Sequence, residues 1–130
     1  MKTVRTTLVA LAAAGLMLQG CVAAVVGAGA GAGTYAYVRG EYQATYPRSL
    51  VSTYTATVKA LNDLDMPVLN SSKDLTDGVI ESKKGDGSAV KIILKSAGNN
   101  ITTVKIRVGI FGDEASSRLI EGKISARLGV

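Results

Sequence analysis

Short runs of alternating apolar and polar residues follow one another between residues 41 and 108 of this 130-residue chain. Alternation with a period of two is typical of a β-strand that buries one face and exposes the other. Turn-forming residues separate the runs at 76–78, 85–88 and 98–100. The pattern predicts strands over residues 41–46, 68–73, 79–84, 89–95 and 101–108.

Two other stretches have the spacing of an amphipathic α-helix. The first follows Ser49, a favourable N-cap residue, and should end near Asp65, because Pro67 disfavours helical geometry just before it. The second should begin near Asp113, whose negative charge suits the N-terminal end of the helix dipole. The expected apolar stripes are Leu50, Tyr54, Val58, Leu61 and Leu64 in the first helix, and Ala115, Leu119, Ile120, Ile124 and Leu128 in the second.

The predicted order of elements is β-α-β-β-β-β-α, which belongs to the α+β class. When the strands have one polar face, amphipathic helices cover only the apolar side of the sheet. We therefore expect two layers, a curved antiparallel sheet with both helices on one face. The same order occurs in TATA-binding-protein-like and helix-grip folds, a likeness of fold that carries no function by itself.

The N-terminal part of the chain has a different pattern. Lys2 and Arg5 precede an apolar, alanine-rich run over residues 8–18, as in a secretory signal peptide. The run is too short for a membrane-spanning helix, which needs about 20 apolar residues. The alternative is an uncleaved membrane helix that continues through Val26 and buries a lone cysteine.

The apolar run ends in Leu18-Gln19-Gly20-Cys21, which contains the only cysteine of the chain. This motif resembles the lipobox of bacterial lipoproteins, in which the signal peptide is cleaved between Gly20 and Cys21. The thiol of Cys21 would then carry a diacylglycerol group, and its new amino terminus a further acyl chain such as palmitate. Two or three acyl chains anchor a protein stably, because each buried CH₂ contributes about 0.8 kcal/mol. We expect no other cofactor.

The lipobox divides the chain into three parts: a signal peptide over residues 1–20, a lipidated membrane-proximal segment over 21–40, and a single α+β domain over 41–130. Val22 follows the modified cysteine, where enterobacterial lipoproteins of the inner membrane have aspartate. This resemblance implies a cell-envelope protein anchored in the outer membrane and facing the periplasm.

The segment over residues 22–36 is almost wholly small or apolar, and it allows three interpretations. Its glycines satisfy a G-x-G-x-x-A dinucleotide motif, but that motif has to follow a core strand and open a helix. Their spacing of four also fits a zipper of closely packed helices. The interpretation we favour is a tether or interfacial segment, with Tyr35 and Tyr37 at the membrane surface. The glycines concerned are Gly27, Gly29, Gly31 and Gly33.

Composition excludes several classes of function. The chain has no histidine, which removes the commonest general base and metal ligand. We find no catalytic residues and no metal-ligand cluster, and we do not expect an enzyme. The net charge is +5, of which Lys2 and Arg5 contribute two, so the remainder is too mildly basic to predict nucleic-acid binding.

Basic residues gather on the predicted polar face of the sheet, around an apolar Ile93. They could form a partner surface for anionic lipid or an acidic protein, but a solvated face is the commoner explanation, and residues such as Glu81 would neutralise part of it. The candidate residues are Lys91, Lys95, Lys105 and Arg107, with Lys83 as a possible addition.

The segment over residues 106–114 is the best candidate for a functional loop. A functional interpretation makes it a loop that contacts a partner. The structural interpretation, which we favour, has Phe111 filling the core, Gly109 and Gly112 forming the corner, and Asp113 capping the second helix.

Taken together, these motifs resemble a family of small bacterial lipoproteins catalogued as a domain of unknown function. The matching pieces are Gly20-Cys21, the glycine-alanine run, Thr34-Tyr35-Ala36-Tyr37, Ala44-Thr45-Tyr46-Pro47 and residues 106–114. The resemblance implies a non-enzymatic, lipid-anchored envelope protein that binds or assembles with another envelope component. Alternatives are a structural protein that self-associates through its glycine zipper and a carrier of small amphipathic ligands.

Overall fold

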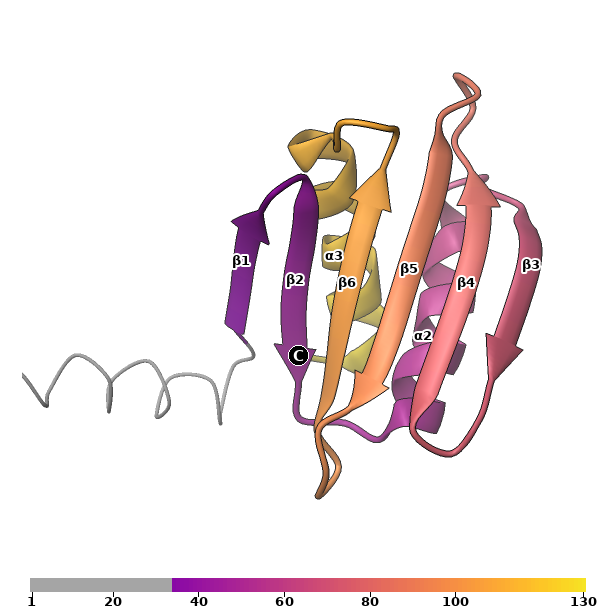
Figure 1. Cartoon of the computed structure of the whole chain (residues 1–130). Coiled ribbons are helices and arrows are strands. Elements are labelled where there is room, and N and C mark those ends of the chain that lie inside the picture. The colour runs from indigo at the N-terminus through magenta and orange to yellow at the C-terminus, as the bar shows by residue number, and fades with distance from the viewer. Residues whose placement is uncertain (1–33) are drawn as a thin grey trace, which may run out of the picture. The chain divides into compact units, whose positions relative to one another are not determined.

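A computed structural model describes residues 34–130, which contain six strands and two helices. They form two layers, with the sheet in front of the helices in Figure 1. The described residues, 34–130, lie within one compact unit. The sheet is antiparallel throughout, in the order β1-β2-β6-β5-β4-β3. The elements are β1 (Thr34–Val38), β2 (Glu41–Tyr46), α2 (Leu50–Asp63), β3 (Val68–Lys73), β4 (Asp77–Lys83), β5 (Ala89–Ser96), β6 (Thr102–Val108) and α3 (Glu114–Leu128).

Both helices cover the same face of the sheet, which confirms the predicted α+β class and its two layers. Helix α3 packs on β2 and β6, α2 packs on β4 and β5, and the two helices contact each other. Alternation along the strands places every second side chain in this interface, where apolar burial stabilises the fold. The fully buried centre consists of Leu61, Ile80, Ile92, Leu94, Val104, Ile106, Ile120 and Ile124.

Most predicted turns are present. The β4–β5 hairpin closes through a hydrogen bond of 2.9 Å from the Lys84 amide to the Ser88 carbonyl. Asn99 and Asn100 both have positive φ in the β5–β6 turn, a conformation that asparagine tolerates well. The third turn lies earlier than predicted, because Asp77 and Gly78 already belong to β4.

The sheet also begins earlier than predicted. Strand β1 pairs with β2 over its whole length, so the sheet starts at Thr34 rather than at the expected domain boundary of residue 41. Tyr35 stacks on Tyr42 with 5.8 Å between the ring centroids, and Tyr37 packs against the core. These two rings therefore belong to the folded domain, where aromatic pairs on neighbouring strands stabilise the sheet.

The buried faces of the helices differ from the predicted stripes. Leu119 is half-exposed and Ala115 is exposed, whereas Ser117 lies fully buried beside Ile120 and Ile124. In α2, Leu50 and Leu61 are buried as expected, and Tyr54, Val58 and Leu64 only pack against the core edge. Small residues occupy the most buried positions because the helices approach the sheet and each other closely. These positions are Thr53, Ala56, Thr57 and Ala60.

The buried serines of α3 give a test of this packing. The Ser116 hydroxyl donates to Asp113 at 2.7 Å, whereas the Ser117 hydroxyl has no hydrogen-bond partner within residues 34–130. A buried polar group without a partner destabilises a fold by about 1–3 kcal/mol. We expect Ser117→Ala to raise the free energy of unfolding by about 1 kcal/mol and Ser116→Ala to lower it, both measured by urea denaturation. A loss of stability in Ser117→Ala would contradict this account.

Candidate functional site

The sequence-predicted sites fall into two groups. Gly20 and Cys21 of the lipobox, and the glycines at 27, 29, 31 and 33, lie outside the described residues, so they stay predictions. The basic residues and the loop over residues 106–114 lie within the domain, where their positions can be stated.

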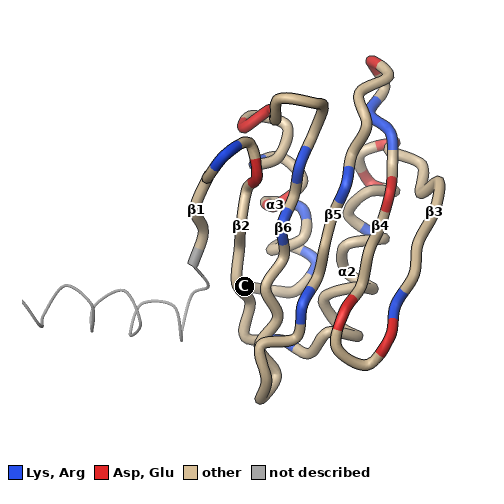
Figure 2. The backbone as a smooth tube through the Cα atoms, in the orientation of Figure 1, with Lys and Arg blue, Asp and Glu red and all other residues tan. Residues whose placement is uncertain are grey.

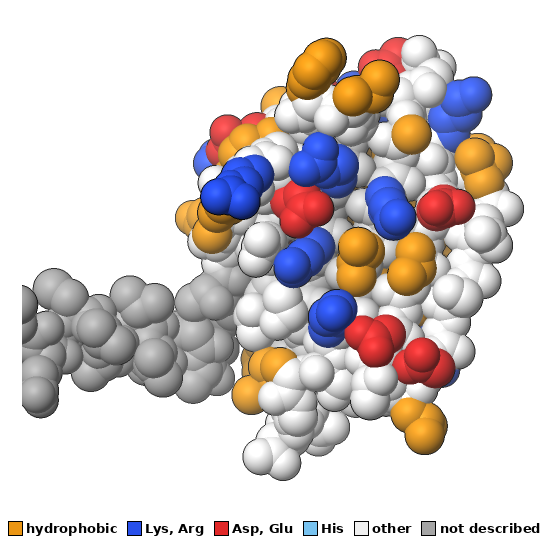
Figure 3. Space-filling model, viewed as in Figure 1, with side chains coloured by type: hydrophobic (Ala, Val, Ile, Leu, Met, Phe, Trp, Pro, Cys, Tyr) orange, Lys and Arg blue, Asp and Glu red, His pale blue; other side chains and the backbone are white. Residues whose placement is uncertain are grey.

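The predicted basic residues do share the uncovered face of the sheet. Lys91 lies opposite Arg107 across β5 and β6, and Ile93 lies opposite Lys105. Figure 2 shows the lysines and arginines along these strands, and Figure 3 shows basic, acidic and apolar side chains interspersed on the same face. The apolar spot at the centre consists of Ile93 and its register partner Val79.

Acidic side chains offset much of this positive charge. Lys95 lies 3.9 Å from Asp77, and Glu81 is the register partner of Lys91. Both groups of the Lys95 pair are well exposed, and exposed pairs of this kind contribute little to stability. The face is therefore a mixed, solvated surface, and the use of Lys91, Lys95 and Lys105 as a partner surface stays a hypothesis.

Arg107 differs from the three lysines because its guanidinium binds the protein's own backbone. One terminal nitrogen donates to the Ile110 carbonyl at 3.1 Å and the other to the Arg39 carbonyl at 2.8 Å, while Nε lies 3.8 Å from Glu41. These contacts join the β6–α3 loop to the β1–β2 turn. We call this junction, centred on Arg107, the loop clasp. It makes Arg107 a structural residue rather than a free cation.

Two glycines complete the loop clasp. Gly40 and Gly112 both have positive φ, at 81° and 85°. A Cβ on Gly40 would lie 2.7 Å from the Phe111 carbonyl oxygen, and one on Gly112 would collide with the Gly40 backbone. Only glycine fits at either position, because conformation and space both exclude a side chain.

The other side of the loop is held by the start of α3. Asp113 is the N-cap, as predicted, and accepts from the Ser116 amide at 3.0 Å. The Ser116 hydrogen bonds, together with the nearby Lys84 ammonium, hold the pKa of Asp113 below its usual value. Lys84 lies 3.6 Å from Asp113 and 3.3 Å from Asp86, so it joins the β4–β5 hairpin to the same loop.

Between these fixed ends, the loop exposes two large apolar side chains. Ile110 is 86% exposed and Phe111 is 92% exposed, and we call this pair the apolar tip. The prediction that Phe111 fills the core is wrong. Gly109 and Gly112, at φ of 73° and 85°, turn the backbone so that the residues between them face solvent. A shallow groove of 580 Å³ separates the tip from the β4–β5 hairpin.

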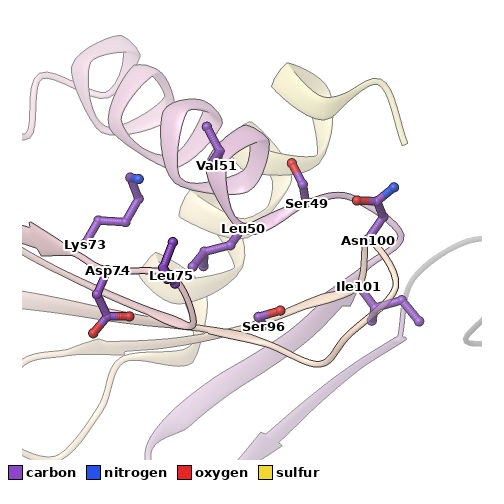
Figure 4. Close-up of a pocket in the computed structure, with 9 residues that line it drawn as sticks. All are labelled: Ser49, Leu50, Val51, Lys73, Asp74, Leu75, Ser96, Asn100 and Ile101. Atoms are coloured by element: carbon purple, nitrogen blue, oxygen red, sulfur yellow. The ribbon is translucent and has the colours of Figure 1, made fainter.

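A second hollow lies at the opposite end of the sheet. It has a volume of 260 Å³ between the first turn of α2 and the β3–β4 and β5–β6 turns (Figure 4). Leu75 at its rim is 96% exposed. Ser49 already accepts from the Ser52 amide at 3.2 Å, so the helix N-terminus there is capped by the protein itself.

Comparison with protein families identifies the family of this chain. The family model described as Protein of unknown function (DUF3568) matches residues 2–127, nearly the whole sequence. The chain belongs to this family. No curated protein matches it. The match covers the N-terminal part of the sequence as well as the domain.

Residues 34–130 contain no group of three or more acidic, histidine or cysteine side chains placed to hold a metal ion. No helix among them has the length and hydropathy to cross a bilayer. What the domain does present is the apolar tip, whose backbone is fixed on both sides.

Sequence reasoning singled out this loop but misplaced Phe111 in the core. It did not single out Ile110, Arg39 or Gly40, since nothing in the sequence indicates that a turn at residue 40 contacts a loop at residue 112. One usable signal was present. Two large apolar residues enclosed by glycines, directly before a helix cap, indicate an exposed tip as readily as a core plug.

The loop clasp can be tested by a matched pair of glycine substitutions. Gly109 and Gly112 both have positive φ, but only Gly112 lacks space for a side chain. We expect Gly109→Ala to lower the free energy of unfolding by about 1 kcal/mol through backbone strain alone. Gly112→Ala adds the collision with Gly40 and should lower it by about 2 kcal/mol or more. Denaturation curves of the two variants make the comparison.

The same experiment has a local readout. Amide hydrogen exchange should rise at the β1–β2 turn in Gly112→Ala and stay unchanged there in Gly109→Ala. Equal effects of the two substitutions would show that the contact between Gly40 and Gly112 carries no stability.

Proposed function

We propose that this chain is a lipid-anchored lipoprotein of the bacterial cell envelope, whose domain is a non-enzymatic binding or assembly module. Residues 18–21 support the anchor, because a positive start, a short apolar run and a Gly-Cys pair agree there. In the proposed mature protein, acylated Cys21 holds the domain at the outer membrane on its periplasmic side.

The observation that carries the binding role is the apolar tip. Contiguous exposed apolar surface marks interaction sites more often than single exposed residues do, and Ile110 and Phe111 are adjacent. Here the exposure does not result from a loose loop, because Arg107, Gly112 and Asp113 hold the backbone on both sides. A fixed apolar surface binds with little loss of conformational entropy, which favours a binding site.

The carrier alternative has less support. Residues that face each other between helices and sheet, such as Leu61, Ile92 and Ile106, are fully buried and fill that space with side chains. The two hollows described above are open surface grooves lined largely by turn residues.

The anchor is tested at its cysteine. We expect mass spectrometry of the membrane-extracted protein to find a chain that begins at Cys21 and carries acyl groups. Cys21→Ser should move the protein out of the membrane fraction, because the thioether cannot form, and leave the domain folded by circular dichroism. Retention of residues 1–20, or an unmodified Cys21 in extracted protein, would refute the anchor.

The binding role is tested in intact cells. A photoreactive residue at position 111 should crosslink to an envelope component, whereas one at Leu69, an exposed apolar residue on the edge strand β3, is the matched control. Equal crosslinking at both positions would remove the support for the tip as a binding site.

A second candidate, self-association, is favoured by the shape of the sheet edges. Strand β3 carries an irregular register at Val68–Asn70 and ends in Lys73, two features that discourage edge pairing. Strand β1, the opposite edge, is a regular five-residue strand, Thr-Tyr-Ala-Tyr-Val, without any charge. An uncharged edge of this kind is open to pairing with β1 of a second copy, alongside the proposed zipper of the preceding glycines.

The self-association candidate makes its own prediction. Ala36 is exposed on β1, and Ser72 is exposed on β3. If copies pair through β1, Ala36→Lys should convert a dimer to a monomer in detergent solution, because a charge on an edge strand opposes pairing. Ser72→Lys, the matched change on the other edge, should leave the dimer intact. Analytical ultracentrifugation measures both, and a monomeric unsubstituted protein ends this candidate.

A further inference from the structure

The apolar tip protrudes at one end of the sheet, next to the turn that follows β1. Ile110 and Phe111 lie side by side in sequence, and each exposes more than four-fifths of its surface. Val38, at the β1–β2 end that Arg107 joins to this loop, is half-exposed as well. Ile110 and Phe111 line one side of the open groove beside the β4–β5 hairpin, and both are highly exposed. Two side chains this exposed can insert into a soft medium without a preformed protein pocket.

The size of the tip also distinguishes between partner classes. A stable protein interface buries about 800 Å² on each side, with apolar anchors surrounded by a polar rim. Two side chains supply only part of that area. Shallow insertion into a bilayer needs much less, because a tethered protein meets the membrane at a high effective concentration and weak contacts are then sufficient.

Basic and acidic side chains both lie at this end of the sheet. The acidic groups nearest the tip, Asp86, Asp113 and Glu114, have ion-pair partners in Lys84 and Arg118. Arg39, Lys83 and Lys91 are exposed there without an ion-pair partner among residues 34–130, although Lys91 is the register partner of Glu81. Basic side chains near an apolar insertion site interact with anionic headgroups and increase binding.

The tether is long enough to allow this contact. Residues 22–33 separate Cys21 from β1 and can span at most about 40 Å, whatever their conformation. The five residues of β1 extend about 17 Å, from Thr34 to the turn that Arg107 joins to the tip. The tip can therefore reach the bilayer that holds the proposed acyl chains.

We propose that Ile110 and Phe111 insert into the surface of a phospholipid bilayer and form a second membrane contact of the anchored domain. This inference rests on the proposed function for its anchor and names the lipid surface as the partner of the tip. The loop clasp holds the tip rigidly, so insertion fixes the orientation of the whole domain relative to the membrane.

The chain has no tryptophan, so a single introduced one reports its own surroundings. Phe111→Trp places the probe at the tip, and Leu75→Trp places a matched probe at the opposite end of the sheet, where Leu75 is 96% exposed. Both variants of the acylated full-length mature protein are reconstituted in vesicles of phosphatidylethanolamine and phosphatidylglycerol. We expect a blue shift of emission and quenching by brominated phospholipids for the tip probe alone.

A third variant separates insertion from mere proximity. Ile110→Asp in the Phe111→Trp background places a charge beside the probe, which should return its emission to that of an exposed tryptophan. Circular dichroism checks that all three variants are folded. Water-like emission of the tip probe, or equal quenching of both probes, would overturn the inference.

The outcomes also separate this inference from the proposed function. Mass spectrometry of the same samples reports whether Cys21 is acylated, independently of the tryptophan signal. An acylated protein with an exposed tip probe overturns insertion and leaves the anchor standing. Crosslinking of position 111 to one identified envelope protein in cells, without lipid quenching, shows that a protein partner occupies the tip instead.

Discussion

The contact between two distant loops is the constraint on which this end of the domain depends. Arg107 binds the carbonyls of residues 39 and 110, and the glycines at 40 and 112 allow the two backbones to touch. Because Arg107 belongs to β6, the centre of the sheet is thereby connected to the turn of the edge strand β1 and to the start of α3. A guanidinium suits this task because its planar donors reach two carbonyls at once. The clasp leaves Ile110 and Phe111 as the part of the loop that faces outward.

The second constraint is that two helices cover one face of a six-stranded sheet. The covered face takes up the apolar positions of the strands, and the uncovered face then has to be compatible with water. Lysines, carboxylates and threonines alternate on the central strands of that face, and Val79 and Ile93 form an apolar pair among them. The mixed charge explains why the lysine row does not create a strong positive field, although the chain as a whole is basic.

Much of the fold was predictable because alternation, helical spacing and turn residues agreed with one another. Ser49 and Asp113 were found as caps, and the helical segments and the strands from Val68 to Val108 were placed within a few residues. Strand β1 was missed because its five residues directly follow a glycine-alanine run. The sequence analysis therefore assigned the start of β1 to the membrane-proximal segment. The buried faces of the helices were predicted incorrectly because Thr53, Thr57 and Ser117 are polar residues that are small enough for close packing. Phe111 was misplaced because contacts that orient a loop come from residues far away in the chain.

The rigidity of the apolar tip is what links its chemistry to a function. In the proposed arrangement, acyl chains on Cys21 already supply firm attachment, so two further apolar side chains would add little to retention at the membrane. Their effect would be on orientation. A domain on a tether rotates freely, whereas a second contact at a fixed point restricts the directions in which the uncovered face can point. A flexible tip would not transmit that restriction, because its backbone would move independently of the sheet. The hydrogen bonds of Arg107 and the close approach of Gly40 and Gly112 join the tip to the strands themselves.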